Sequence, residues 1–257
     1  MKTCRGCLFV FLICISQLVQ AGGGTKVIAH RGYWKTDGSA QNSLASIQKA
    51  GKLGVYGSEF DVIVAYDGVP MVNHNNDYQG RHIEGTSSAV LKTLKLSNNE
   101  TLPTLEEYIA EGKKHPKMKM ILELKPHSTA GKDVEAASRV FALVQKMNAR
   151  DQVEYITFSL TAGKELIRLD PQAKVVYLNG ELSPRELKDL GFSGLDYHYN
   201  VMKKHPEWFK EAKDLGLTVN VWTVNTPELI KEMIDSGADY ITTDEPELVV
   251  DIIGKMK

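Results

Sequence analysis

The chain has 257 residues, of which 42% are hydrophobic and 25% are charged, and its formal net charge at pH 7 is −1. This composition is typical of a folded globular protein, and the near-zero charge argues against nucleic-acid binding, which usually requires a basic surface. The length suits two domains or one α/β barrel, since such barrels commonly have about 250 residues.

Residues 1–21 have the pattern of a signal peptide. Two basic residues precede an apolar run, and Ala21 ends a small-residue cleavage pattern. The run is shorter than the roughly 20 apolar residues of a membrane-spanning helix. Lipid attachment at Cys14 is disfavoured because Ile13 is large where such sites need a small residue. We expect a mature chain of residues 22–257 without cysteine or stable membrane insertion, located in the bacterial periplasm or secreted.

Eight β-rich runs follow, and at least one stretch with helical spacing follows each. Thr104 and Glu107 form a capping-box pattern, and Pro227 marks the first turn of another helix. Strand–helix alternation without a linker predicts a single TIM-type (β/α)8 barrel. A doubly wound open sheet usually has a glycine-rich loop after its first strand, where this chain has His30-Arg31-Gly32. The runs are 26–32, 58–65, 119–125, 153–159, 174–180, 194–200, 217–225 and 238–244.

A short segment after the second run does not fit this alternation. Residues 70–74 follow an Asp67-Gly68 turn, and Asp-Gly is a strong signal for a two-residue hairpin loop. We therefore expect a short antiparallel hairpin beside the barrel, followed by a small insertion over 76–101. A turn centred on Asp67-Gly68 would place Asp61 directly opposite His74, with Cβ atoms about 4.5–5.5 Å apart.

Three carboxylates are expected to meet at one end of the barrel. Glu59 and Asp61 share one face of the second strand, because alternate residues of a strand point to the same side. In the third strand the two leucines of Ile-Leu-Glu-Leu-Lys face the helices, so Glu123 and Lys125 point inward. Barrel active sites lie at the carboxyl ends of the strands, where the first strand contributes His30 and its neighbour.

The charges at this end indicate metal-assisted phosphodiester hydrolysis. Two unit charges about 4 Å apart repel by about 4 kcal/mol at an effective dielectric constant of 20, so one carboxylate must be protonated or a cation must be bound. Ligation by oxygen atoms alone favours Ca²⁺ or Mg²⁺. His30 and His74 suit general acid and base catalysis, and Arg31 and Lys125 offer donors to a phosphate.

Several short motifs occur in a fixed order: His30-Arg31-Gly32, Asn42-Ser43, Glu59-x-Asp61, His74, Leu102 to Glu107, Glu123-Leu124-Lys125, Val221 to Asn225 and Ile241 to Pro246. Together they resemble the glycerophosphodiester phosphodiesterases. The resemblance implies a barrel that cleaves glycerophosphodiesters to glycerol 3-phosphate and an alcohol. It also implies roles for eight residues: metal ligands at Glu59, Asp61 and Glu123, catalytic histidines at His30 and His74, phosphate contacts at Arg31 and Lys125, and a pocket wall at Trp222.

Two positions depart from the family pattern. Gln41 stands where a glutamate is common, and Asn75 stands where an aspartate is common after the histidine. We expect these changes to affect rate and pH optimum rather than reaction class. His198 and Tyr199 end another strand on the same rim and are candidates for substrate contact. The remaining histidines are expected at the surface or in loops: His82, His115, His127 and His205.

Two other functions stay open at this point. A phospholipase C-like or D-like lipid phosphodiesterase also uses a histidine pair on a barrel, but it should carry an exposed apolar rim, and the segment after His74 is polar. A non-catalytic exported barrel could bind phosphodiesters, although binding alone does not require a pair of histidines. The expected partner is a small-molecule glycerophosphodiester substrate, and the oligomeric state is left open.

Overall fold

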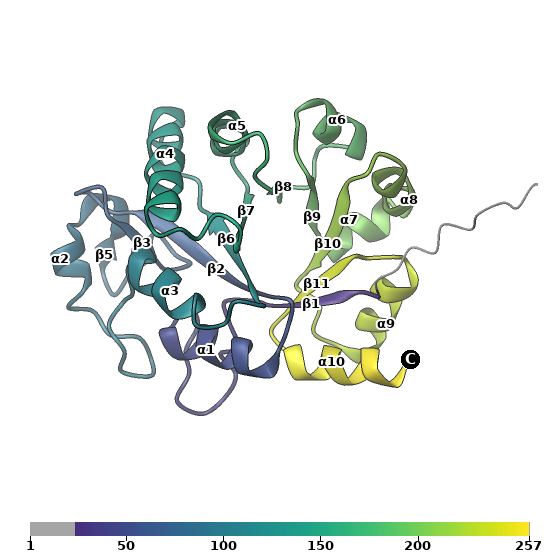
Figure 1. Cartoon of the computed structure of the whole chain (residues 1–257), viewed down its shortest axis with the longest axis horizontal. Helices are drawn as coiled ribbons and strands as arrows, with labels where there is room; N and C mark the ends of the chain where they lie inside the picture. The colour runs from purple at the N-terminus through teal and green to yellow at the C-terminus, as the bar shows by residue number, and fades with distance from the viewer. Residues whose placement is uncertain (1–23, 257) are drawn as a thin grey trace, which may run out of the picture.

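The computed structural model describes residues 24–256, which form a closed barrel of eight parallel strands (Figure 1). Each strand pairs with the next, and β1 pairs with both β11 and β2, which closes the barrel. All eight predicted strands are present and the predicted fold is confirmed. The barrel strands are β1 (Lys26–Ala29), β2 (Gly57–Val64), β6 (Lys119–Leu124), β7 (Val153–Thr157), β8 (Val175–Tyr177), β9 (Gly194–His198), β10 (Thr218–Trp222) and β11 (Tyr240–Thr243).

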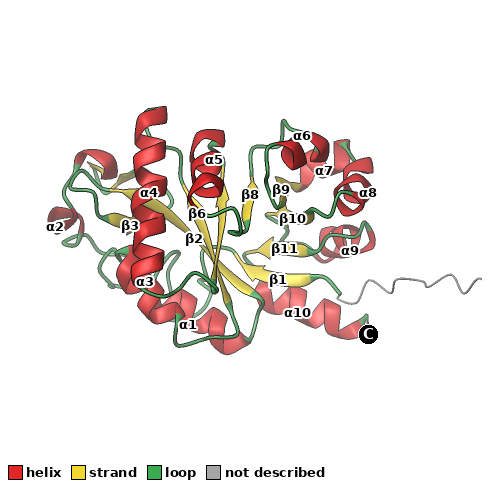
Figure 2. Cartoon of the chain, turned by 45° about the horizontal axis from the view of Figure 1, so that its top comes forward, coloured by secondary structure: helices red, strands yellow, loops and turns green. Residues whose placement is uncertain are grey.

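Helices cover the outside of the barrel (Figure 2). The predicted capping box of Thr104 and Glu107 begins α3, and Pro227 lies in the first turn of α9. Within residues 24–256 no helix has the length and apolarity needed to cross a membrane. The helices are α1 (Leu44–Leu53), α3 (Leu105–Gly112), α4 (Ala130–Lys146), α5 (Leu160–Leu169), α6 (Pro184–Asp189), α7 (Tyr199–Lys204), α8 (Glu207–Asp214), α9 (Pro227–Asp235) and α10 (Pro246–Lys255).

Strand parity separates two hydrophobic layers. Leu122 and Leu124 are fully buried in the large core between the strands and the helices, as predicted. Ile28, Ile121 and Ile156 belong to a smaller cluster on the opposite, inward face of their strands. Glu123 follows the same parity as Ile121 and so points into the barrel, two residues closer to the carboxyl end.

The predicted hairpin exists, but its expected register is wrong by one residue. In β3 (Pro70–Val72), Val72 pairs with Val62 of β2, so Asn73 lies opposite Asp61. The reason is the turn: the Ala65 amide donates to the Val69 carbonyl at 2.9 Å, which leaves a three-residue loop of residues 66–68 instead of a two-residue one. Gly68 ends this loop at a φ of 81°, as a three-residue hairpin loop requires.

The insertion after β3 has a small core of its own. Ile63 and Met71 from the hairpin pack with Ile83 and Leu91 from the insertion and with Leu102, which directly follows it. This cluster fixes the segment beside β3, at the edge of the molecule in Figure 1. Its short elements are β4 (Asp77–Tyr78), β5 (Arg81–His82), the 3-10 helix η1 (Ile83–Gly85) and α2 (Ser88–Leu91).

Candidate active site

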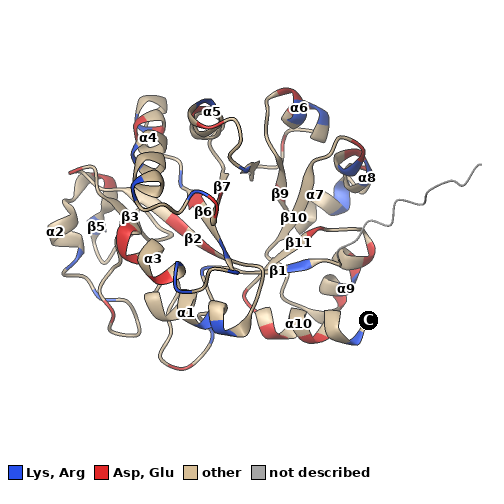
Figure 3. Ribbon diagram, viewed as in Figure 1, with Lys and Arg blue, Asp and Glu red and all other residues tan. Residues whose placement is uncertain are grey.

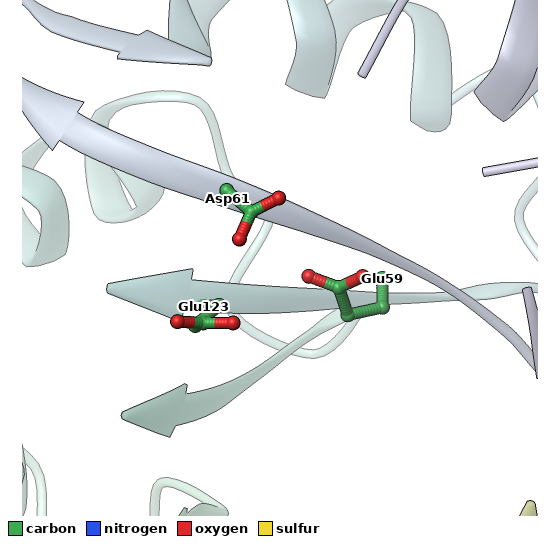
Figure 4. Close-up of side chains that lie close together, drawn as sticks. All are labelled: Glu59, Asp61 and Glu123. Atoms are coloured by element: carbon green, nitrogen blue, oxygen red, sulfur yellow. The ribbon is translucent and has the colours of Figure 1, made fainter. Parts of the chain in front are cut away.

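Glu59, Asp61 and Glu123 form a buried acidic triad on two adjacent strands. Asp61 of β2 lies beside Glu123 of β6 in the parallel register, and Glu59 is two residues earlier on β2. One oxygen of each carboxylate lies within 4.8 Å of one from each of the others. Figure 4 shows the three carboxylates turned toward a common space, and Figure 3 shows the acidic segments of β2 and β6 side by side.

Burial and mutual repulsion determine the charge of the triad. Burial, together with the charges of Asp61 and Glu123, raises the pKa of Glu59 well above its usual value. Burial and the charge of Asp61 raise the pKa of Glu123 to about 8. Burial opposes ionisation of Asp61 as well, but the Lys125 ammonium, His74 and a hydrogen bond from Asn42 keep its pKa below the usual value. At neutral pH the metal-free triad therefore retains protons.

The donor set of the triad fits a hard divalent cation. All candidate ligands are carboxylate oxygens, which Ca²⁺ and Mg²⁺ prefer. Glu59 Oε1 is buried and has no hydrogen-bond partner among the described residues. A cation here would satisfy that oxygen and replace the protons on the triad.

The loop after β1 connects the triad to two further polar side chains. The Arg31 amide donates to Glu59 Oε2 at 2.8 Å, and Asn42 donates through Nδ2 to Asp61 Oδ2 at 2.9 Å. The Arg31 guanidinium donates to Gln41 Oε1 at 2.8 Å and has its Nε 3.8 Å from Asp61. Arg31 is thus held by Gln41, one of the two departures from the family pattern.

Lys125 joins the triad from the end of β6. Its ammonium lies 2.7 Å from Glu123 Oε1 and 3.2 Å from Asp61 Oδ1. Burial alone would lower the pKa of Lys125, but these two carboxylates raise it, so the side chain stays positively charged. It can therefore offer a full charge to an anionic ligand in the cavity.

The two histidines have different partners. His30 Nδ1 lies 2.7 Å from Asp244 Oδ1, and Asp244 also accepts hydrogen bonds from Asn225 Nδ2 at 2.9 Å and Trp34 Nε1 at 3.1 Å. Burial opposes ionisation of Asp244, but the hydrogen bond and charge of His30, together with the hydrogen bonds from Asn225 and Trp34, outweigh it and the pKa of Asp244 falls to about 2. A permanent carboxylate therefore fixes the His30 ring.

The Nδ1 atom of His74 has an amide oxygen as its partner instead of a carboxylate. Its Nδ1 lies 2.8 Å from Asn75 Oδ1, so the second departure from the family pattern contacts the ring directly. Burial lowers the pKa of His74, and the charges of Lys125 and Arg31 lower it further against the opposing effect of Asp61. The residue follows the end of β3, so strand alternation no longer dictates its direction and it reaches the triad despite the shifted register.

One cavity of about 100 Å³ brings the predicted site together. Seven of the eight predicted residues line it, and the eighth, Asp61, completes the triad. Phe158 and Trp222 form part of its apolar wall; the indole donates to the Asp196 carbonyl at 2.9 Å and meets Phe158 edge-on. His198 and Tyr199 do not line this cavity, although the His198 ring packs against the indole at 5.1 Å.

The comparison with known families agrees with this geometry. A family model described as Glycerophosphoryl diester phosphodiesterase family matches residues 30–248. The chain belongs to this family. Its enzyme class and the hydrolysis of glycerophosphodiesters, both predicted from the sequence, are thereby confirmed.

Individual relatives of this glycerophosphodiester phosphodiesterase family cover almost the whole chain. A crystal structure of a glycerophosphodiester phosphodiesterase from Parabacteroides distasonis is 52% identical, with a TM-score of 0.90 over 92% of this chain and 100% of that one. A curated enzyme from Caldanaerobacter subterraneus is 25% identical over 90% of this chain and 98% of its own length. An Oleispira antarctica phosphodiesterase in complex with the product sn-glycerol-3-phosphate is 27% identical, with a TM-score of 0.79 over 90% and 97% of the two chains.

Two residues near the predicted site, Asp244 and His127, were not predicted to matter. Asp244 directly follows β11, the last strand, and barrel closure brings it to His30. Its position at the carboxyl end of a predicted strand was the signal that could have indicated a role in the site. His127 was expected at the surface or in a loop; it does lie in a loop, but its side chain is only 3% exposed. Its Nε2 accepts a hydrogen bond from the Val64 amide at 3.0 Å, which joins the loop after β6 to β2.

Proposed function

We propose that this protein hydrolyses glycerophosphodiesters with the help of one divalent cation and a pair of catalytic histidines. One observation carries the proposal: an acidic triad, two cationic side chains and two oriented imidazoles surround the same cavity. The likeness to the Oleispira phosphodiesterase in complex with sn-glycerol-3-phosphate supports glycerol 3-phosphate as a product. The other product would be the alcohol of the substrate.

The phosphate would be held by the cationic side chains of the cavity. Arg31 and Lys125 offer charged donors to its non-bridging oxygens. Glu59, Asp61 and Glu123 would hold Ca²⁺ or Mg²⁺, and a bound cation supplies electrostatic stabilisation for charge that develops on the phosphate. Trp222 and Phe158 offer an apolar wall to the carbon atoms of the substrate and limit the entry of water.

The histidines would move the protons. A carboxylate at His30 Nδ1 and an amide oxygen at His74 Nδ1 both favour a proton on that nitrogen, which leaves Nε2 of each ring for catalysis. One imidazole would remove the proton of the attacking hydroxyl group through Nε2, and the other would protonate the departing alkoxide. The two rings would exchange these roles in the reverse reaction.

A direct assay tests this proposal. We would measure the release of glycerol 3-phosphate from several glycerophosphodiesters in the presence of Ca²⁺, Mg²⁺ or EDTA. His74→Ala should lose activity by at least about 100-fold, because general acid or base catalysis contributes about 10²–10⁴-fold. His198→Ala is the matched control, since that histidine lies near the rim but does not line the cavity. Equal turnover with EDTA and with cations, or an active His74→Ala protein, would refute the proposed mechanism.

We also propose that the protein is exported and that residues 1–21 are removed. The support is the basic start, the apolar run and the small-residue pattern before residue 22. This segment lies outside the described residues. Amino-terminal sequencing of the protein from periplasmic and medium fractions tests the proposal, and an intact Met1 in an exported sample would contradict cleavage.

A further inference from the structure

A second, larger cavity of about 430 Å³ adjoins the catalytic one. The two cavities share Arg31 and His74, so they meet where the phosphate would lie. A phosphodiester carries two substituents on one phosphate. A phosphate held at Arg31 would therefore direct one substituent into each cavity. The inner cavity of about 100 Å³ suits a three-carbon glycerol, which leaves the outer one for the alcohol.

The wall of this outer cavity is rich in neutral hydrogen-bonding groups. It includes the amides of Gln41, Asn73 and Asn75 and the hydroxyls of Ser39 and Ser97, and none of its lining residues is an aspartate or a glutamate. Gln41 Oε1 accepts a hydrogen bond from Arg31, and within residues 24–256 its Nε2 donates to no acceptor. This Nε2 group can donate a hydrogen bond to a hydroxyl of a ligand.

The charged groups of the wall are both cationic. Arg31 also lines the catalytic cavity, whereas Lys35 lines the outer cavity alone. The Lys35 ammonium is 5.4 Å from the centre of the Trp34 ring and 2.5 Å from Glu245. Lys35 therefore already makes a cation–π contact with Trp34, and the carboxylate of Glu245 beside it is already paired.

Two of the amides in this wall belong to Gln41 and Asn75, which are both uncharged. Neither amide can form an ion pair with a cationic head group. A ligand ammonium in this cavity would lose solvation without gaining an opposite charge, which is unfavourable.

We propose that the outer cavity is the leaving-group subsite and that it selects an uncharged, hydroxyl-rich alcohol over choline or ethanolamine. This inference rests on the proposed function and extends it to the class of head group. Hydroxyls of a polyol would be satisfied by the amides and hydroxyls of the wall, and its carbon-bound hydrogens can pack on the part of Trp34 that faces the cavity.

Competing substrates test the proposal on the wild-type protein. We would determine kcat/KM for glycerophosphoinositol and glycerophosphoglycerol, and for glycerophosphocholine and glycerophosphoethanolamine, under the same metal and pH conditions. We expect the polyol diesters to be preferred by about tenfold or more, because several unmade hydrogen bonds and an unpaired charge separate the two classes. Equal or better turnover of the choline diester would overturn this inference and leave the proposed function intact. No turnover of any diester would refute the proposed function itself.

Variants that change a charge test whether the selectivity for the head group arises in the outer cavity. Lys35→Glu should raise kcat/KM for the choline diester relative to the inositol diester by about fivefold, because it reverses one charge at a solvent-exposed wall. Lys35→Gln should give a smaller change in the same direction. Lys52→Glu carries the same charge change on an exposed residue of α1 outside the cavity and should leave the ratio unchanged. An unchanged ratio in both Lys35 variants, or an equal shift in Lys52→Glu, would overturn the assignment.

Discussion

Replacing Glu123 by glutamine should stabilise the metal-free protein at alkaline pH and remove most of its stabilisation by a divalent cation. The pKa of Glu123 is raised from its usual 4.5 to about 8. The folded state therefore binds more protons than the unfolded state between these values, so metal-free stability falls as the pH rises through this window. Glutamine does not titrate and contributes no such loss.

The expected change in the free energy of unfolding of Glu123→Gln follows from the distances in the triad. Carboxylate charges no more than 4.8 Å apart repel by at least about 3.5 kcal/mol at an effective dielectric constant of 20. Against this gain, the variant loses the ion pair in which the Lys125 ammonium lies 2.7 Å from Glu123 Oε1, a charged contact that contributes about 1.5–3 kcal/mol. At pH 9 in EDTA we expect a net gain of about 1 kcal/mol, or about 2–4 °C in Tm.

The cation response separates the variant from the wild type. A ligand at 100 times its Kd stabilises the folded state by about 2.7 kcal/mol, so Ca²⁺ or Mg²⁺ should raise the wild-type Tm by about 5–10 °C. With two carboxylates left, Glu123→Gln should gain less than about a third of that at the same cation concentration. Thermal unfolding at pH 9, with EDTA or with added cation, measures both quantities.

A matched variant controls for the loss of any buried carboxylate. Glu154 is also buried, and it accepts a hydrogen bond from Tyr56 and pairs with Lys174 at 2.9 Å, away from the triad. Glu154→Gln should lower stability and keep the full cation response. The reasoning on the triad is refuted if Glu123→Gln is less stable than wild type at pH 9 in EDTA, or if cations stabilise both proteins equally.

Three further changes test other contacts. Asp244→Asn should lower kcat about 10- to 100-fold with little change in KM, because it weakens the anchor of His30; a rise in KM alone would contradict that role. Burial lowers the pKa of His127, so the free energy of unfolding should fall as the pH drops below about 6.5. His127→Gln should make the free energy of unfolding depend less on pH, as measured by urea unfolding at pH 5–7. An unchanged pH dependence in the variant would contradict this role of His127. Gly32→Ala should cost about 1–3 kcal/mol or more in the same assay, because Gly32 has a φ of 77° and a Cβ would lie 2.3 Å from Ser46 Oγ; wild-type stability would contradict this strain.

Strand parity explains why so much of the site could be predicted from the sequence. The period of two placed Glu59 and Asp61 on one face of β2 and sent Glu123 inward, and the register of β2 with β6 brings these faces together. The fold class followed from eight strand–helix alternations in the same local way. Such inferences need only neighbouring residues, which the sequence displays directly.

The hairpin shows where local reasoning fails. Asp67-Gly68 suits both a two-residue loop and the last two positions of a three-residue loop. The structure has the three-residue loop. The choice depends on the contacts of the flanking strands, since Met71 and Ile63 must pack with the insertion. His74 still reaches the cavity because the chain leaves the strand after Val72 and is no longer bound to its alternation.

The two histidines also show what barrel closure adds. Asp244 is separated from His30 by 214 positions, and no local pattern relates them. They meet because β11 pairs with β1, with Thr243 beside Ala29, so the residues that follow each strand lie next to each other. His74, by contrast, takes its partner from the next residue in the chain, Asn75. The carboxylate that orients one imidazole is thus supplied by the last strand of the barrel, and this arm of the site can form only when the barrel closes.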